Sequence, residues 1–214
     1  MSCIHRLGIL AIVLLHLQPL FAADPPVASA IEAGAMASES LGREEFFEIY
    51  LPPGYKNSKE TYPVLYFLHG MFDHQGTWQE RGIGAQVDKL IAEGAVKPMV
   101  IAIPNGGRFS FWCNSLDGTE PVEDFVLKDF IPYIEKQYRV EKTRTGRAIS
   151  GISMGGFGSL KLAFKHPDLF GSVTAHSAFL MPAPLDQLPP EALQSRRLRF
   201  FNRIFGNPVD TQHW

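Results

Sequence analysis

A serine flanked by glycines, Ser153, has the sequence context of a catalytic nucleophile. It stands in the run Gly151-Ile152-Ser153-Met154-Gly155, after a strand-like segment over 147–150 and before a helix-like segment over 157–164. A G-x-S-x-G motif between a strand and a helix is typical of a nucleophile elbow, a sharp turn that exposes the serine hydroxyl. The glycines remove side chains that would crowd this turn. The sequence therefore predicts Ser153 as the attacking group of an acyl transfer.

Two backbone amides are candidates for stabilising the oxyanion that such an attack creates. Met154 follows the serine at the start of the predicted helix, whose N-terminal N–H groups and dipole favour negative charge. A second donor is expected in the loop after an early buried strand, where the chain reads Leu68-His69-Gly70-Met71. Gly70 lets the backbone approach a substrate carbonyl, so we assign this donor to the N–H of Met71. His69 and Gly70 are expected beside the pocket, with His69 bracing the loop.

The base that accepts the serine proton is expected to be a histidine. His176 ends a predicted strand next to the nucleophile strand, where it is either that base or a structural brace. His213 is the alternative, with Asp186 or Asp210 as the acid that orients it. Nucleophile, base and acid usually come from separate strand ends, whereas His213 and Asp210 share one short segment at the end of the chain.

The elements around these residues alternate between strand and helix. Strands are predicted over 45–51, 62–68, 99–103, 147–150 and 171–176, and helices over 83–94, 120–138, 157–165 and 191–205. Pro132 is expected to kink or locally disrupt the second of these helices. The alternation predicts an α/β fold with a mainly parallel sheet that helices cover on both faces.

Composition restricts the class of protein. The 214 residues are 45% hydrophobic, which is enough for one domain with a large core. The net charge is −2 and no basic run stands out, so nucleic acid is not an expected partner. Cys113 would be alone in a chain that has lost its leader, which excludes an internal disulfide. A buried, inert thiol is the favoured role for Cys113.

The N-terminus predicts export. Residues 1–23 carry Arg6 and a long apolar run that ends in Ala22-Ala23, the pattern of a secretory signal peptide. His16, Gln18 and Pro19 interrupt that run, so no membrane span is expected after its removal. Residues 24–43 are expected to be a flexible leader and residues 44–214 the folded domain, located in the periplasm or outside the cell.

Several motifs together resemble the esterase D and feruloyl esterase group of α/β-hydrolases, which also includes the mycolyltransferases. The matching segments are 62–70 (YPVLYFLHG), 117–119 (DGT), 130–135 (FIPYIE), 138–140 (YRV), 147–158 (RAISGISMGGFG) and 166–170 (HPDLF). The resemblance implies a serine esterase without a metal or organic cofactor, acting on a small-molecule or carbohydrate-linked ester. It carries over Ser153 with the amides of Met71 and Met154.

The same resemblance places the family's catalytic Asp and His on later strands, beyond Trp214. On this interpretation the chain is the N-terminal part of an α/β-hydrolase domain that is incomplete at its C-terminal end, and it is inactive if it lacks the triad Asp and His. Two alternatives stay open: an acyltransferase of the same fold, because an alcohol can discharge the acyl-enzyme in place of water, and an exported binding protein without catalysis.

Aromatic residues near the predicted site have two possible roles. Trp78, Phe111 and Trp112 would either line an acyl or leaving-group pocket or belong to the core. The run Phe111-Trp112-Cys113-Asn114 also departs from relatives that carry a tyrosine and an acidic residue there, which affects acyl specificity and not the class of reaction.

Overall fold

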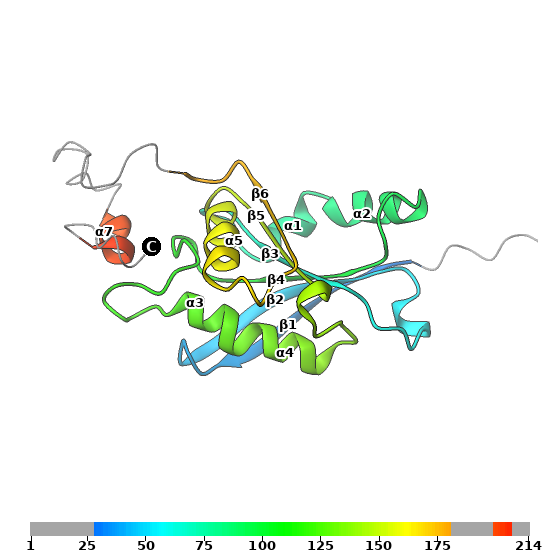
Figure 1. The fold of residues 1–214 in the computed structure, drawn as a ribbon, viewed down its shortest axis with the longest axis horizontal. Helices are drawn as coiled ribbons and strands as arrows, with labels where there is room; N and C mark the ends of the chain where they lie inside the picture. Colours follow the sequence, from blue (N-terminus) through cyan, green and yellow to red (C-terminus); the bar gives the residue numbers. More distant parts are fainter. Residues whose placement is uncertain (1–27, 181–198, 207–214) are drawn as a thin grey trace, which may run out of the picture.

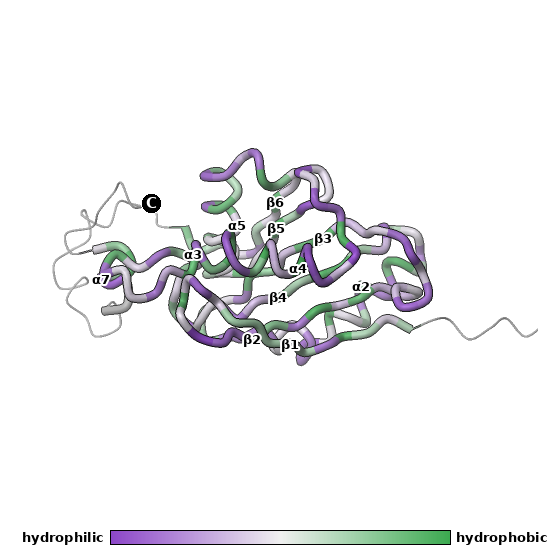
Figure 2. The backbone as a smooth tube through the Cα atoms, turned by 90° about the horizontal axis from the view of Figure 1, so that it is seen from below, coloured by the Kyte–Doolittle hydropathy of each residue, from purple (hydrophilic) through white to green (hydrophobic). Residues whose placement is uncertain are grey.

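A six-stranded sheet forms the centre of the computed structural model, which describes residues 28–180 and 199–206. The strands lie in the order β1-β2-β4-β3-β5-β6, so β1 and β6 form the two edges (Figures 1 and 2). The strands are β1 (Ala30–Ser38), β2 (Arg43–Leu51), β3 (Val64–Leu68), β4 (Val100–Pro104), β5 (Arg147–Ile152) and β6 (Ser172–His176). The helices are η1 (Tyr55–Asn57), α1 (Thr77–Glu80), α2 (Ile83–Ala92), α3 (Val122–Asp124), η2 (Phe125–Phe130), α4 (Ile131–Gln137), η3 (Arg144–Gly146), α5 (Met154–Lys165) and α7 (Arg199–Phe205).

The sheet combines a parallel part with an antiparallel edge. β4, β3, β5 and β6 pair in parallel, and helical segments connect them, as parallel strands require. β1 and β2 form an antiparallel hairpin that joins the sheet through β4. The predicted α/β class with a mainly parallel sheet is therefore confirmed, with a hairpin added at one edge.

Side chains alternate between the two faces of the sheet, and each face has its own core. Val64, Tyr66 and Leu68 point into a large core shared with α5, α7, η2 and α4. Leu65 and Phe67 point into a smaller core under α1 and α2. Figure 1 shows α2 on one side of the sheet and α4 on the other. Burial on both faces explains why the central strands read as continuous apolar runs.

Strand β1 corrects the expectation that residues 24–43 are a flexible leader. Ala30–Ser38 pairs with β2 along its whole length. Its small residues fit because Phe47 of β2 packs over them: a Cβ on Gly34 would lie 2.3 Å from the Phe47 ring. An Ala-rich and Gly-containing strand lacks the β-branched residues that mark strands in a sequence, although it fits a crowded sheet face.

The helix predicted over 120–138 is interrupted at the expected place. It comprises α3, the π-helical η2 and then α4, with Pro132 in the first turn of α4. Proline has no N–H for the regular i to i−4 bond, and a π-helical turn immediately before it changes the hydrogen-bond register. The predicted local disruption at Pro132 is confirmed.

The remaining predictions fall partly outside the described residues. The signal peptide over 1–23 lies outside them, as does most of the predicted helix 191–205, of which α7 is described. Within the described ranges, none of the helices combines the length and apolar character needed to cross a bilayer.

Candidate active site

Ser153 lies at the junction of β5 and α5 in a strained backbone conformation. Its φ is 55° and its ψ is −111°, a region that residues with a side chain rarely adopt. Strain of this kind costs about 1–3 kcal/mol and persists only where the surrounding structure enforces it. The predicted strand, sharp turn and helix are therefore present, and Ser153 is only partly buried.

The two glycines of the motif are required by backbone contacts. A Cβ on Gly151 would lie 2.2 Å from the carbonyl oxygen of Gly155, and a Cβ on Gly155 would lie 1.9 Å from that of Leu68. Real Cβ atoms do not approach carbonyl oxygens so closely. The glycines thus let the first turn of α5 pack directly against β3. The atoms that a side chain at either glycine would meet belong to the backbone of Gly155, Leu68 and His69, and not to Ser153.

Three hydrogen bonds hold the backbone of Ser153 in place. Its N–H donates to the carbonyl of His176 at 2.9 Å, and its carbonyl accepts from the N–H groups of Phe157 and Phe179, each at 3.0 Å. The turn is thereby fixed to its own helix and to the chain that follows β6. These hydrogen bonds hold the strained conformation of Ser153 in place, as a strained residue requires.

The amides of Met71 and Met154 are available as donors. Neither N–H donates to any group in the described part of the chain, and Met154 is the first residue of a helix, where N–H groups lack internal acceptors. The loop that carries Met71 lies against the elbow, because a Cβ on Gly70 would be 3.5 Å from the carbonyl oxygen of Ile152. The loop that precedes Met71 is therefore close to the elbow, and Met154 follows Ser153 directly in the chain; the role of the two amides as oxyanion donors stays a prediction.

His69 braces this loop. Its ring is 2% exposed, its Nδ1 is 2.9 Å from the carbonyl of Gly70 and its ring packs edge-on against Trp112 at 5.0 Å. Burial lowers the pKa of His69, so the imidazole is neutral and Nδ1 carries the proton that Gly70 accepts. A buried, neutral histidine in this position shapes the loop and is not placed to exchange protons with solvent.

No side chain in the described ranges is hydrogen-bonded to the Ser153 hydroxyl. His176 is exposed at the end of β6, and its carbonyl, not its ring, contacts Ser153. The other candidates for base and acid, namely His213, Asp186 and Asp210, lie outside the described residues.

The aromatic candidates for a pocket are core residues, the second of the two roles that the sequence allowed. Trp78, a residue of α1, is 4% exposed and packs on Tyr50 in the smaller core. Phe111 and Trp112 are fully buried and both have positive φ values, 52° and 57°. Each ring is enclosed by neighbours from distant parts of the chain, which favours the core role for Trp78 and Trp112.

Trp112 connects three segments around the site. Its ring occupies the space left by two glycines: a Cβ on Gly106 would lie 2.2 Å from the ring, and one on Gly158 would lie 2.6 Å from the Trp112 side chain. Its Nε1 donates to the carbonyl of His69 at 3.2 Å. The loop after β4, the loop after β3 and helix α5 are thus held together by one side chain.

An exposed aromatic pair, not singled out by the sequence, stands beside the oxyanion loop. Phe72 and Phe109 are 64% and 37% exposed and meet edge to face, with ring centroids 4.9 Å apart. The N–H of Phe72 also donates to the carbonyl of Arg108 at 3.1 Å. Phe72 follows Met71 in the chain, so this pair borders the predicted oxyanion loop.

A buried cluster of charges anchors α5 to α3. Glu123 is 4% exposed and contacts the Nζ atoms of Lys161 and Lys165 at 2.6 and 2.8 Å and the Nε2 atom of His166 at 3.2 Å. Burial opposes ionisation of Glu123, but the hydrogen bonds from Lys161 and Lys165 prevail and lower its pKa to about 2. Cys113 lies beside this cluster, and burial raises its pKa to about 11, so its thiol stays protonated as expected.

Acid is expected to weaken the fold through Glu123. The pKa of Glu123 is lower in the folded chain than the ordinary value of 4.5 that it has in the unfolded chain. At pH values above 4.5 the ionised carboxylate therefore stabilises the fold, and this contribution is lost as the pH falls toward 2. We expect a loss of up to about 3 kcal/mol from this group between pH 5 and 2. Urea unfolding across this range measures the loss.

The Glu123→Gln variant should be less stable at pH 7, by about 3–5 kcal/mol, because it leaves the buried Lys161 without its partner. It should also lose this part of the pH dependence. Asp124→Asn is the matched control, because the ion pair of Asp124 with Lys128 is on the surface. A Glu123→Gln variant with the same acid profile as the wild type would contradict the assignment.

Within the described residues, no three His, Cys, Asp or Glu side chains are grouped so that they could hold a metal ion.

A family model described as "Putative esterase" matches residues 38–214. An endo-1,4-beta-xylanase/feruloyl esterase of Xylanibacter ruminicola is 33% identical over 141 residues, which cover 63% of this chain and 19% of that protein. An esterase of Mycobacterium tuberculosis is 35% identical over 145 residues, which cover 65% of this chain and 30% of that protein. The chain thus spans less than a third of the length of these two relatives.

Two solved structures have a similar fold. A ferulic acid esterase superposes with a TM-score of 0.71 at 34% identity, covering 85% of this chain and 68% of that one. A fluorophosphonate-binding serine hydrolase of Staphylococcus aureus superposes with a TM-score of 0.68 at 21% identity, covering 84% of this chain and 66% of that one.

Proposed function

Because this chain belongs to the esterase family of α/β-hydrolases, as its motifs predicted, we propose that it is a serine carboxylic ester hydrolase that acts through an acyl-enzyme on Ser153. The observation that carries the proposal is the strained conformation of Ser153 at the junction of β5 and α5. Strain at a strand-to-helix turn is expected where it presents a nucleophile.

In the proposed reaction, Ser153 Oγ attacks the ester carbonyl carbon while a histidine accepts the hydroxyl proton. The carbonyl oxygen becomes an oxyanion and is stabilised by the N–H groups of Met71 and Met154, each worth about 3–4 kcal/mol of barrier. The bond to the alcohol then breaks, and the histidine returns the proton to the leaving alcohol. Water, activated by the same histidine, releases the acid and restores Ser153. Within this sequence the candidates for this histidine are His176 and His213, whereas the family resemblance places it beyond Trp214.

The relatives and the N-terminus support a proposal for substrate and location. Two similar proteins are named for feruloyl or ferulic acid esters, and one of them also carries a xylanase name. We therefore propose a carbohydrate-linked ester of an aromatic acid as the substrate. The apolar run within residues 1–23 supports export to the periplasm or the medium.

Reaction of the full chain with a fluorophosphonate probe tests the nucleophile. The serine oxygen displaces fluoride from phosphorus, so peptide mass mapping should find the adduct on Ser153 in the folded protein and no adduct after heat denaturation. An adduct on another serine would contradict the assignment of Ser153. Absence of any adduct on the folded chain would favour the binding protein without catalysis.

A further inference from the structure

Two exposed aromatic rings stand at the edge of the sheet that carries Ser153. β4, β3 and β5 are parallel neighbours, so their carboxyl ends lie at one edge of the sheet. Phe72 belongs to the loop after β3 and Phe109 to the loop after β4, whereas Ser153 follows β5 directly. Ligands of open α/β sheets bind outside the carboxyl ends of the strands. The two rings are therefore at the end of the sheet where a substrate is expected.

Backbone geometry gives no reason for a phenylalanine at position 72. The carbonyl of Gly70 accepts from the N–H of Asp73 at 3.2 Å, so residues 70–73 form a β-turn with Phe72 in its third position. The φ of Phe72 is 69°, and a positive φ at this position of a turn is normally supplied by glycine or asparagine. For a bulky residue it is a genuine outlier. Phe72 is also 64% exposed, so burial in the core does not explain it either.

The two loops are fixed to each other before any ligand binds. The N–H of Phe72 donates to the carbonyl of Arg108 at 3.1 Å. The Nε1 of Trp112 donates to the carbonyl of His69 at 3.2 Å. The rings of Phe72 and Phe109 meet at an interplanar angle of 84°. A ligand that binds to rings held in this way loses less free energy to ordering than one that must first arrange them.

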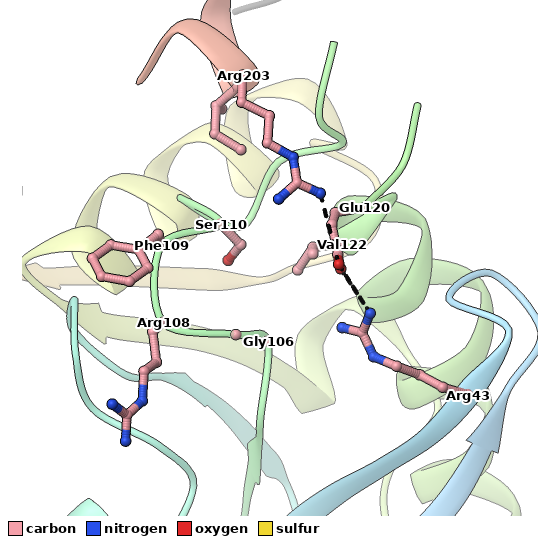
Figure 3. A pocket seen from close by; sticks show the side chains of 10 residues that line it. Arg43, Gly106, Arg108, Phe109, Ser110, Glu120, Val122 and Arg203 are labelled. Atoms are coloured by element: carbon pink, nitrogen blue, oxygen red, sulfur yellow. Dashed lines mark hydrogen bonds and ion pairs between the residues drawn. The ribbon is translucent and has the colours of Figure 1, made fainter. Parts of the chain in front are cut away.

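The Phe109 ring faces away from the charged groups near its loop. In Figure 3 the ring is directed away from Glu120, and Glu120 forms ion pairs with Arg43 and Arg203. These charges neutralise one another, so the surface that the two phenylalanine rings present is apolar.

Charged residues adjoin both rings in the chain. Asp73 follows Phe72. Arg108, which is exposed, precedes Phe109. Both oxygens of the Asp73 carboxylate accept from Arg81 Nη2, at 3.1 and 3.0 Å, which leaves lone pairs for further donors. An apolar surface with polar groups at its border suits a ligand that is apolar on one side and hydroxylated at its rim.

We propose that Phe72 and Phe109 bind the apolar face of a sugar ring, and that this sugar belongs to the alcohol part of the substrate. A pyranose with equatorial hydroxyls carries C–H groups on its two faces and hydroxyls around its rim. Stacking on an aromatic ring buries the C–H groups and sets their partial positive charge against the negative face of the ring. An aromatic acyl group is apolar on both faces and needs an enclosed pocket instead. The assignment of the sugar to the substrate rests on the proposed esterase function, whereas the binding of a sugar does not.

Saturation-transfer NMR of the full chain with xylotriose, whose pyranose rings have equatorial hydroxyls, tests the ring pair. We expect saturable binding with a dissociation constant on the order of 1 mM, and the strongest transfer to the C–H protons of the ring faces. Xylitol, an open-chain polyol without such a face, should bind much more weakly. The Phe109→Ala variant should weaken xylotriose binding about tenfold, because one stacking ring is lost.

Substitutions at position 72 separate the role of the ring from that of the backbone. Phe72→Gly removes the ring and gives the turn the residue that its φ favours. Its thermal unfolding midpoint should therefore not fall, while its xylotriose binding weakens about tenfold. Phe72→Tyr keeps the ring and should bind xylotriose as the wild type does. A Phe72→Gly variant that binds xylotriose as the wild type does, or that unfolds at a clearly lower temperature, would contradict the proposal.

Phe164→Ala is the matched control. Phe164 is 74% exposed but stands near the end of α5, roughly 15 Å along the helix from its first residue, and its substitution should leave xylotriose binding unchanged. Equal losses in the Phe109→Ala and Phe164→Ala variants would overturn the site, as would equal binding of xylotriose and xylitol. Tighter binding of ferulate, with the same dependence on Phe109, would overturn the assignment to a sugar.

The two proposals fail in distinguishable ways. Xylotriose binding does not require Ser153, so a Ser153→Ala variant should bind it as the wild type does. A chain that forms the fluorophosphonate adduct without binding xylotriose would contradict the sugar site alone. A chain that binds xylotriose without forming the adduct would contradict the esterase alone.

Discussion

The Gly155→Ala variant is expected to lose more than about 4 kcal/mol of unfolding free energy, or to fail to fold. The added methyl would stand 1.9 Å from the carbonyl oxygen of Leu68 and 2.6 Å from that of His69. Alanine favours a helix over glycine by about 1 kcal/mol, but this gain is small beside a clash with backbone that cannot rotate away. Relief of the clash requires α5 to move off β3, which would displace Ser153 and Met154 from the oxyanion loop.

Gly84→Ala is the matched control, since Gly84 is also helical. Its added Cβ would meet the end of the Ile31 side chain at 2.8 Å, and a flexible side chain can yield. We expect a change within about 1 kcal/mol. Chemical denaturation of both variants measures the difference, and similar stabilities would contradict the close packing of α5 on β3.

The Ser153→Ala variant is expected to lower hydrolysis of a short-chain p-nitrophenyl ester by about 10⁴-fold or more, because loss of the nucleophile removes the acyl-enzyme route. Its stability should change by less than about 0.5 kcal/mol. Alanine keeps the Cβ, so the strain at φ 55° remains, and the lost hydroxyl has no partner in the described structure. Initial rates and thermal unfolding measure the two effects separately.

Ser177→Ala is a close control, because Ser177 also has a positive φ, 45°, and lies one residue after His176. Its rate should equal that of the wild type. Equal hydrolysis by wild type and Ser153→Ala would mean that the observed turnover does not pass through Ser153, and the proposed mechanism would then be wrong.

The elbow could be predicted from the sequence because its determinants are local. A glycine on either side of the serine, a strand before it and a helix after it all lie within 147–165. The central strands could also be predicted, because a strand buried on both faces has a continuous run of apolar residues in the sequence. The disruption of the helix at Pro132 could also be predicted, because the effect of the missing N–H is local and acts within one turn.

Strand β1 and the roles of the aromatic residues depend on distant neighbours. Ala30–Ser38 is a strand because β2 pairs with it and Phe47 covers Gly34, and nothing in the segment itself indicates either contact. Trp112 is a core residue because Gly106 and Gly158 leave room for its ring. An aromatic side chain in a loop has the same sequence signal whether it faces a ligand or fills a core.

The enclosure of Trp112 has a consequence for how this chain can change during evolution or engineering. Gly106 and Gly158 have no freedom to gain a side chain while the indole ring occupies the space above them. The order of substitutions therefore matters at Gly106, where a smaller residue at 112 has to come first. At Gly158 a smaller residue is not enough, because the nearest atom is the Cβ of Trp112 at 2.6 Å, which every residue except glycine keeps. Substitutions at the three positions are therefore coupled, although about fifty residues separate the first from the last.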